Sequence, residues 1–278
     1  MKKLILFLII FFILTSILYA QNFKGGQQRV EILPPQDKLV IGETLRYSVE
    51  WLGIPMGKII LRAVGIENIN GHECYHINAQ SFPNRFFRRF YDIEYKVDTY
   101  IDTKTFYPQR FEKTRRIKDI FTYVIIEFNR EKNEAIYHYY SPKGPSEVFD
   151  FPSLRREMVA NEIITIKVPP DAQDLLSSLY YFRLQNIKED TVYSLNISYH
   201  SKNWPVEIKI EKPFLRDMHK KGTFAVIELS PSSELNDFIL GRRGMRVYFT
   251  VDSRRIPLLF TLNSAVGIIR GVICDLPK

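Results

Sequence analysis

Alternation of apolar and polar residues runs through most of the chain, and it constrains the fold more than any other feature. In Tyr91–Asp102, residues such as Ile93, Tyr95 and Val97 alternate with charged residues. A strand of this kind has one dry and one wet face, which is typical of antiparallel sheets. The same alternation recurs at residues 45–51, 193–199 and 206–211. We therefore predict a mainly β protein, built as a large curved antiparallel sheet or a barrel-like β fold.

One segment departs from this period of two and predicts one amphipathic helix at about residues 171–183. Asp171 follows two prolines and suits a helix N-cap. Arg183 falls inside the apolar stripe of this helix, and two interpretations stay open. The helix frays there or the guanidinium reaches water over apolar surface; alternatively, the side chain is partly buried and holds a carboxylate. The stripe consists of Leu175, Leu176, Leu179, Tyr180 and Phe182.

Residues 1–20 have the pattern of a secretory signal. Lys2 and Lys3 precede an apolar run that ends at Leu18, and Ala20 is a small residue suited to cleavage. No cysteine follows this run, so we expect no lipoprotein anchor. No other stretch reaches the roughly 18 apolar residues of a membrane helix, so we expect no transmembrane span after signal cleavage. These features predict a periplasmic or secreted protein.

The remaining chain is expected to contain a loose lead-in and one domain. Paired glycines, glutamines and prolines mark residues 21–41 as the lead-in, and residues 42–278 form a single β-rich domain. A hydrophobic content of 45% and a charged content of 25% over the full chain exclude disorder as its main state.

A weak internal sequence similarity, which we call the internal echo, raises the hypothesis that the chain consists of two related halves. The stretch from Asp102 through Pro108 resembles the stretch from Asp252 through Pro257. In each, an aspartate precedes a short polar turn and can cap it by accepting backbone N–H bonds. Each proline lacks an N–H and suits the start of a strand. Duplication and coincidence account for the echo equally well.

The sequence His72-Glu-Cys-Tyr-His76 matches the letters of a zinc-protease motif, but its context favours a strand. The motif requires a helix, because residues four apart then share one face. On a strand the two histidines lie about 13 Å apart and cannot share one metal ion. We therefore predict an extended segment and no metal site or cofactor. Export permits a disulfide between Cys74 and Cys274, and whether they pair stays open.

Basic clusters are the remaining feature, with a formal net charge of +8. Solvated turns account for them, and so does a face for anionic lipid head groups or an envelope polymer. Nucleic acid is not an expected partner, because no nucleic-acid-binding fold is evident. The clusters include Arg85, Arg88, Arg89, Lys113, Arg115, Arg116, Lys118, Lys220, Lys221, Arg242, Arg243, Arg246, Arg254 and Arg255.

The opening of the predicted domain, Gly42-Glu-Thr-Leu-Arg-Tyr47 followed by Gly53 and Gly57, resembles the bacterial domain-of-unknown-function family 3108 (DUF3108). The resemblance extends over roughly residues 42–275. It implies export and a mostly antiparallel β fold, and it implies no catalytic residues. Its most specific stretch runs from Gln173 to Arg183 and contains Asp174, Ser177 and Tyr180.

The leading functional hypothesis is a non-enzymatic envelope protein whose curved sheet forms a cup for an amphiphile or anionic envelope polymer. A scaffold that binds another envelope protein is the alternative, and a hydrolase using aspartates such as Asp102, Asp174 or Asp252 is less favoured. No catalytic residue is assigned. The expected ligand contacts are Arg85, Arg88, Arg89, Arg183, Arg242, Arg243 and Arg246. The expected structural motif residues are Asp102, Pro108, Asp174, Ser177, Tyr180, Asp252 and Pro257.

Overall fold

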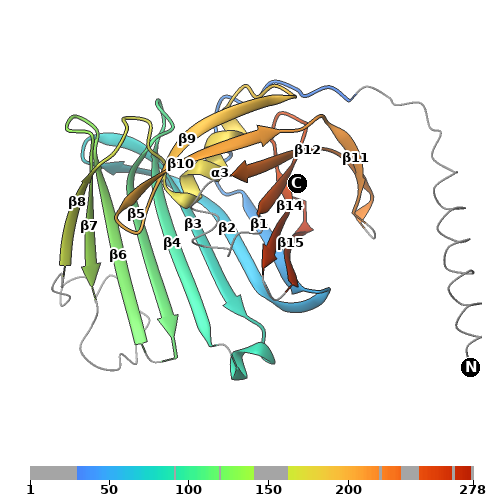
Figure 1. Ribbon diagram of the computed structural model, residues 1–278, viewed down its shortest axis with the longest axis horizontal. Helices are drawn as coiled ribbons and strands as arrows, with labels where there is room; N and C mark the ends of the chain where they lie inside the picture. Colours follow the sequence, from blue (N-terminus) through green and yellow to red (C-terminus); the bar gives the residue numbers. More distant parts are fainter. Residues whose placement is uncertain are drawn as a thin grey trace, which may run out of the picture. The chain divides into compact units, whose positions relative to one another are not determined.

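Backbone hydrogen bonds join the strands of the described residues into one sheet of fifteen antiparallel strands (Figure 1). The computed structural model describes residues 30–90, 92–118, 120–140, 162–218, 221–232, 244–264 and 267–276. The predicted mainly β fold is thereby confirmed. The strands are β1 (Thr44–Trp51), β2 (Ile54–Ile69), β3 (His72–Pro83), β4 (Ile93–Asp102), β5 (Pro108–Ile117), β6 (Ile120–Asn129), β7 (Glu134–Tyr140), β8 (Glu162–Lys167), β9 (Thr191–Tyr199), β10 (Lys202–Ile210), β11 (Phe214–Asp217), β12 (Thr223–Ser232), β13 (Met245–Thr250), β14 (Pro257–Ser264) and β15 (Gly267–Asp275).

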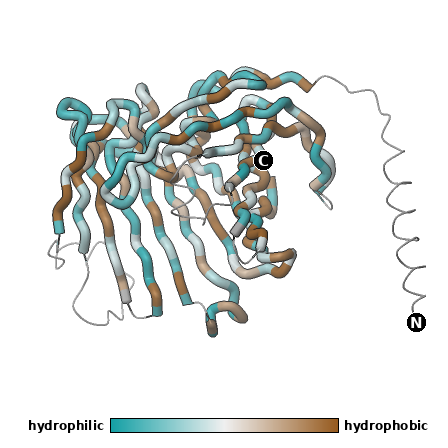
Figure 2. The backbone as a smooth tube through the Cα atoms, in the orientation of Figure 1, coloured by the Kyte–Doolittle hydropathy of each residue, from teal (hydrophilic) through white to brown (hydrophobic). Residues whose placement is uncertain are grey.

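Most neighbouring strands of the sheet are also neighbours in the chain, and the pairing of β1 with β15 is the one long-range exception among the described strands. The strand order runs β8-β7-β6-β5-β4-β3-β2-β1-β15-β14-β13-β12-β10-β9, and β11 pairs with β12. The pairing of β1 with β15 therefore joins the two ends of the described domain. Hydropathy alternates along many of these strands, as expected for a sheet with one dry face (Figure 2).

The sheet curls without a backbone ladder between its outermost described strands, β8 and β9. Side chains span this gap instead. The hydroxyl of Tyr137 on β7 lies 2.7 Å from that of Ser198 on β9, and the hydroxyl of Tyr139 lies 2.8 Å from that of Ser201. The edge of β9 is also covered, because the backbone N–H of Gln173 donates to the carbonyl of Asn196 at 2.7 Å. The architecture is an open, barrel-like sheet.

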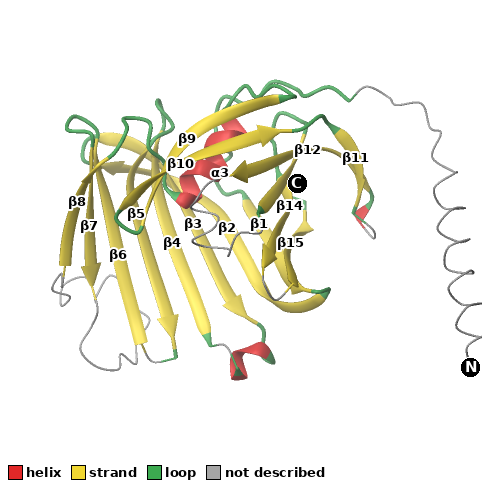
Figure 3. Cartoon of the chain, viewed as in Figure 1, coloured by secondary structure: helices red, strands yellow, loops and turns green. Residues whose placement is uncertain are grey.

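The described α-helix, α3, spans Leu175–Leu184 and contacts β4 and β9 (Figure 3). It begins later than predicted, because its N-cap is Asp174 and not Asp171. Oδ1 of Asp174 accepts the backbone N–H groups of Leu176 and Ser177, and Oγ of Ser177 accepts the N–H of Asp174. This capping box outcompetes Asp171, because the intervening Gln173 is extended and pairs with β9.

The helix lies between two apolar clusters, so most of its surface is covered. Leu176 and Tyr180 belong to the cluster formed with β1–β4 and β12–β15, whereas Phe182 belongs to the cluster formed with β9, β10, β12 and β13. Leu175 and Leu179 are half-buried and pack against these clusters. The predicted stripe therefore packs on the sheet.

Arg183 is buried, with 1% of its surface exposed, and it forms two hydrogen bonds with the carboxylate of Glu43. Its Nη1 and Nη2 lie 2.6 and 2.8 Å from Oε2 and Oε1 of Glu43. Its Nε and Nη2 also donate to the backbone carbonyl of Arg254. The alternative of a buried arginine holding a carboxylate is thus confirmed, and the frayed or water-exposed arginine is wrong.

Arg255 is the second buried arginine, and it connects three separate segments. Its guanidinium donates to the carbonyls of Phe182 and Gln185 at the end of α3, and to that of Leu33 in the lead-in. A cation at a helix C-terminus satisfies carbonyls that have no partner within the helix. The compact unit of the sheet begins at Ile32, so part of the lead-in belongs to it.

The two echoed turns have the same local geometry. Oδ1 of Asp102 accepts the N–H groups of Lys104 and Thr105 at 2.9 and 2.8 Å. Oδ1 of Asp252 accepts the N–H groups of residues 254 and 255 at 3.0 and 3.2 Å. Pro108 and Pro257 begin β5 and β14. The predicted turn capping and strand starts are confirmed, while the duplication of two halves stays a prediction.

We predict that Glu43→Gln lowers the free energy of unfolding by about 3–5 kcal/mol, because it leaves the guanidinium of Arg183 buried without its counter-charge. The double variant Glu43→Leu/Arg183→Met should lose less, because it removes both charges. Urea unfolding measures both. Glu134→Gln is the matched control, because it breaks an exposed pair with Lys167 and should cost at most about 1 kcal/mol. Equal losses for Glu43→Gln and Glu134→Gln would contradict the prediction.

Candidate functional site

A pocket of about 210 Å³ lies against β4–β7, and the turn between β9 and β10 contributes to its wall. Five aromatic rings and three basic side chains define its chemistry. The volume lies below the roughly 300–1,000 Å³ of pockets that enclose drug-sized molecules, so it suits a head group or a short chain segment. The aromatic residues are Tyr95, Phe111, Tyr137, Tyr139 and Tyr199, and the basic residues are Lys113, Arg115 and His200.

Strand periodicity places most of these side chains on one face of the sheet. Phe111, Lys113 and Arg115 are alternate residues of β5, so their side chains point the same way. In the sheet register Arg115 pairs with Tyr95 on β4, and Lys113 pairs with Val124 on β6. Cations and aromatic rings thus lie next to one another across neighbouring strands.

The wall formed by the β9–β10 turn is tied to the sheet. Tyr137 and Tyr139 belong to the pocket lining, and their hydroxyls contact Ser198 and Ser201 beside Tyr199. These hydrogen bonds hold the turn over the inner face of β7. The pocket is therefore a fixed feature of the open barrel.

Lys113 is the distinctive residue of the pocket, because no described carboxylate pairs with it. Its Nζ lies 4.9 Å from the ring centroid of Tyr199, which is a cation–π distance. Burial, followed by the positive charge of Arg115, lowers the pKa of Lys113 to about 8. Burial together with the charges of Lys113 and Arg115 also lowers the pKa of His200. An anion in the pocket would stabilise the charged form of Lys113.

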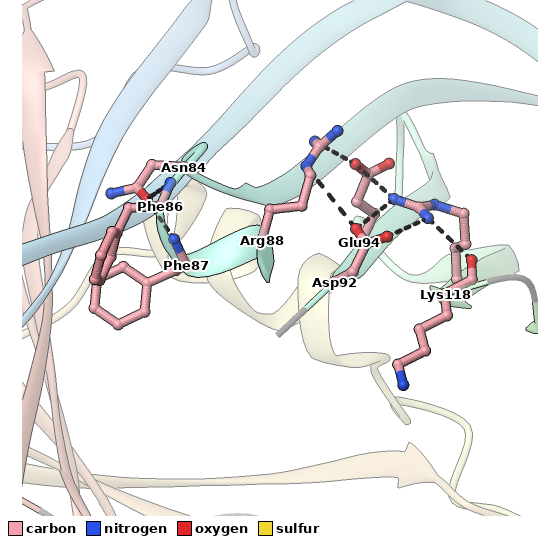
Figure 4. Close-up of polar contacts among 8 residues, drawn as sticks. Asn84, Phe86, Phe87, Arg88, Asp92, Glu94 and Lys118 are labelled. Atoms are coloured by element: carbon pink, nitrogen blue, oxygen red, sulfur yellow. Dashed lines mark hydrogen bonds and ion pairs between the residues drawn. The ribbon is translucent and has the colours of Figure 1, made fainter. Parts of the chain in front are cut away.

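The expected ligand residues Arg85, Arg88 and Arg89 are exposed in the connection between β3 and β4. Nη2 of Arg88 lies 2.6 Å from the carboxylate of Glu94, within the network that Figure 4 shows. None of these three arginines belongs to the pocket lining. Their role as ligand contacts stays a prediction.

The remaining expected arginines separate in space. Arg246 is exposed on β13, where its Nε lies 3.1 Å from the carboxylate of Glu228. Arg242 and Arg243 lie outside the described residues. We correct the expected ligand role of Arg183, because Glu43 and a backbone carbonyl already occupy its buried guanidinium.

The three aspartates considered for hydrolysis have structural contacts. Asp102 and Asp252 cap turns, and Asp174 caps α3. The hydroxyl of Thr99 donates to Asp174 at 2.5 Å. Burial raises the pKa of Asp174 despite these hydrogen bonds. The expected structural motif residues Ser177 and Tyr180 are likewise buried on the helix.

The predicted extended form of residues 72–76 is confirmed, because they lie on β3. Nδ1 of His72 lies 2.9 Å from Asp102, and the ring nitrogens of His76 contact Glu67 and Asp98. Burial opposes protonation of His76, but these two carboxylates outweigh it and raise its pKa. Within the described ranges, no group of three or more histidine, cysteine or acidic side chains is arranged to hold a metal ion.

Cys74 and Cys274 are free thiols. They lie on β3 and β15, and the sheet order places β2 and β1 between these strands. Three strand spacings of about 4.8 Å exceed the reach of a disulfide, whose Cα atoms lie within about 7 Å. Burial raises the pKa of Cys74 to about 12, which makes it an unreactive thiol.

The sequence profile described as "Protein of unknown function (DUF3108)" matches residues 46–273. The chain belongs to the DUF3108 family. No curated protein matches this DUF3108 chain significantly. In the part of the chain that the structure describes, no helix is long and apolar enough to cross a membrane.

Three solved structures are similar to the chain to different degrees, and the first of them shares its general fold. A β-barrel-like protein of the DUF1849 family from Brucella abortus superposes with a TM-score of 0.53 at 10% identity, over 87% of this chain and all of that one. A candidate lipoprotein from Parabacteroides distasonis has a TM-score of 0.31 at 10% identity, over 90% of this chain and 100% of that one. A candidate exported protein with a YmcC-like fold from Bacteroides fragilis has a TM-score of 0.32 at 9% identity, over 89% and 99%.

Sequence reasoning on this DUF3108 chain groups Lys113 and Arg115 with the basic clusters but does not count them among the expected ligand contacts. It does not single out Tyr199 or His200. One available signal is the position of Lys113 and Arg115 on the same face of β5 as the buried Phe111. The contribution of Tyr199 and His200 depends on the curl of the sheet, which local periodicity does not reveal.

We predict that Lys113→Met removes a pH-dependent part of the stability. The pKa of Lys113 is about 8 in the folded protein and 10.5 ordinarily, so the unfolded chain binds more protons between these values. The free energy of unfolding of the parent protein should therefore rise with pH across this window. Urea unfolding below pH 8 and near pH 10.5 measures the rise. Lys104→Met, at an exposed turn residue, should retain it, and an unchanged slope in Lys113→Met would refute the assignment.

Proposed function

We propose that this DUF3108 protein is a non-enzymatic cell-envelope protein that binds the anionic head group of an amphiphile in the pocket of β4–β7. The single observation that carries the proposal is Lys113, a half-buried cation with aromatic neighbours and no described carboxylate partner. Folded proteins normally pair a cation that is removed from water. A ligand anion is the partner that this arrangement lacks.

The surroundings of Lys113 favour an amphiphile over a small inorganic anion. Arg115 adds a second cation, while Phe111, Val124 and Ile126 supply apolar surface in the same pocket. A carboxylate or phosphate would contact the cations, and the adjoining part of an acyl or similar chain would lie against the rings. The volume of about 210 Å³ accommodates the head group and the first part of such a chain.

The envelope location rests on the sequence of residues 1–20, which lie outside the described residues. Their basic start, apolar run and small residue at position 20 form a secretory pattern. An exported protein with a cup-shaped sheet encounters envelope lipids and their precursors. We therefore place the protein in the periplasm or outside the cell.

We predict that cis-parinaric acid, a fluorescent fatty acid, binds more tightly than its methyl ester, because only the acid carries a negative charge. Lys113→Met should weaken binding of the acid about tenfold, or ~1.4 kcal/mol, and leave binding of the ester nearly unchanged. Affinity for the acid should also fall as the pH rises through about 8, where Lys113 loses its charge. Fluorescence titration measures these affinities.

The control is Lys104→Met, which removes one lysine charge from an exposed turn outside the pocket. It should bind the acid as the parent protein does. Equal affinities for acid and ester, or equal binding by the parent protein and Lys113→Met, would reject the proposal. The scaffold function would then become the better hypothesis, with a second envelope protein as the partner.

A further inference from the structure

The connection between β3 and β4 exposes two large aromatic side chains to solvent. Phe86 and Phe90 are 63% and 69% exposed, whereas phenylalanine is among the residue types most often buried in folded proteins. Their ring centroids lie 5.6 Å apart, and Phe87 packs against Phe86 at 5.4 Å. The short 3-10 helix η1, Phe87–Arg89, forms the centre of this aromatic tip.

The aromatic tip is a built structure, with Asn84 as its anchor. Oδ1 of Asn84 accepts the N–H groups of Phe86 and Phe87 at 3.0 and 2.9 Å, and Figure 4 shows both contacts. Nδ2 of Asn84 donates to the carbonyl of Pro55, and its backbone N–H donates to that of Met56. The backbone that carries the exposed rings is therefore already ordered, which lowers the entropic cost of binding through them.

A second exposed apolar turn lies beside the aromatic tip. The bonds from Asn84 to Pro55 and Met56 attach the tip to the start of β2. Leu52 in the β1–β2 turn and Ile54 at the start of β2 are 63% and 53% exposed. Antiparallel pairing thus gathers four exposed apolar side chains at one end of the sheet, which we call the hairpin end.

The aromatic tip is surrounded by more positive than negative side chains. The acidic residues Asp92 and Glu94 are already paired with Arg88 and Arg116, at distances of 2.6–3.9 Å. Arg85 and Arg89 are exposed and pair with no described carboxylate. Figure 4 shows the ammonium group of Lys118 directed away from the paired network. The hairpin end therefore presents cations around exposed rings.

We propose that the hairpin end docks on the surface of a bilayer that contains anionic lipids. Phe86 and Phe90 enter the boundary between head groups and acyl chains, and Arg85 and Arg89 contact lipid phosphates. A projecting tip of this kind fits a deformable lipid surface. A protein partner would require a complementary hollow, and the cationic rim selects a negatively charged surface.

This inference goes beyond the proposed ligand pocket, and it concerns different residues. The two sites are nonetheless neighbours in the sheet. Tyr95 and Arg115 line the pocket. Tyr95 lies two residues from Ile93 on β4, and Arg115 lies two residues from Ile117 on β5, where these strands reach the hairpin end. A molecule leaving the bilayer at the hairpin end would reach the pocket after a distance of only a few residues along the strands.

The test uses the full chain and vesicles of phosphatidylcholine, with or without a minority of phosphatidylglycerol. Phe90→Trp places a fluorophore in the aromatic tip, and lipids brominated on their acyl chains quench it on insertion. We expect this variant to lose more emission than the parent protein, whose Trp51 and Trp204 report the background. Quenching should depend on phosphatidylglycerol less at about 1 M salt than at about 0.01 M, where the Debye lengths are ~3 and ~30 Å, because salt screens the attraction between the arginines and the anionic lipid. The apolar contact survives this screening.

Two pairs of matched variants separate the apolar and charged contributions. Phe86→Ser/Phe90→Ser should reduce co-sedimentation with the same vesicles about tenfold, whereas Val192→Ser/Leu215→Ser, at residues 61% and 60% exposed on other strands, should not. In the Phe90→Trp background, Arg85→Gln/Arg89→Gln should reduce quenching at low salt. Lys104→Gln/Lys132→Gln removes the same charge from turns at the opposite end of the sheet and should leave quenching unchanged.

The outcomes separate docking on lipid from docking on protein. Absence of additional quenching at residue 90, or equal effects of test and control variants, would overturn the proposal. A change of oligomeric state in Phe86→Ser/Phe90→Ser, seen by size-exclusion chromatography, would overturn it in favour of a second copy of the chain as the partner. Lys113→Met should leave quenching unchanged, so failure of the pocket and failure of docking are distinguishable.

Discussion

Burial of two guanidinium groups is the constraint on which the described domain depends. Arg183 and Arg255 are among its largest fully buried side chains, and a buried guanidinium is costly unless its donors find acceptors. Those acceptors come from segments far apart in the sequence: Glu43 before β1, the end of α3, the β13–β14 turn and Leu33. Placing both guanidinium groups therefore requires the lead-in, α3 and the β13–β14 turn to assemble together.

The two ends of the sheet have different roles because hairpins alternate between them. One end carries the turns capped by Asp102 and Asp252, together with the buried arginines and α3. Most hydrogen bonds of the buried arginines and of the two capped turns are made within this end, so it stabilises the fold. The opposite end carries the β1–β2 and β3–β4 connections, where apolar side chains are exposed and cations surround them. Exposed apolar groups beside unpaired charge are typical of a contact surface.

The pocket is a consequence of incomplete closure. A closed ladder between β8 and β9 would bring the backbones of these strands within about 5 Å of each other. Side chains of Tyr137 and Tyr139 bridge to the β9–β10 region instead. The longer bridge leaves space on the inner face of β5 and β6, and the chain places Lys113 in that space. The proposed ligand contact thus depends on how far the sheet curls.

The strand architecture, the Asp-capped turns, the extended form of residues 72–76 and the approximate helix can be predicted from sequence, because they depend on local periodicity and backbone capping. Tertiary packing sets the helix start at Asp174, since Gln173 pairs with β9. It also decided the partner of Arg183 and the separation of Cys74 from Cys274. The pocket around Lys113 could likewise not be predicted from the local sequence pattern. Such features depend on contacts between residues distant in the chain, and these are set by strand order and sheet curvature.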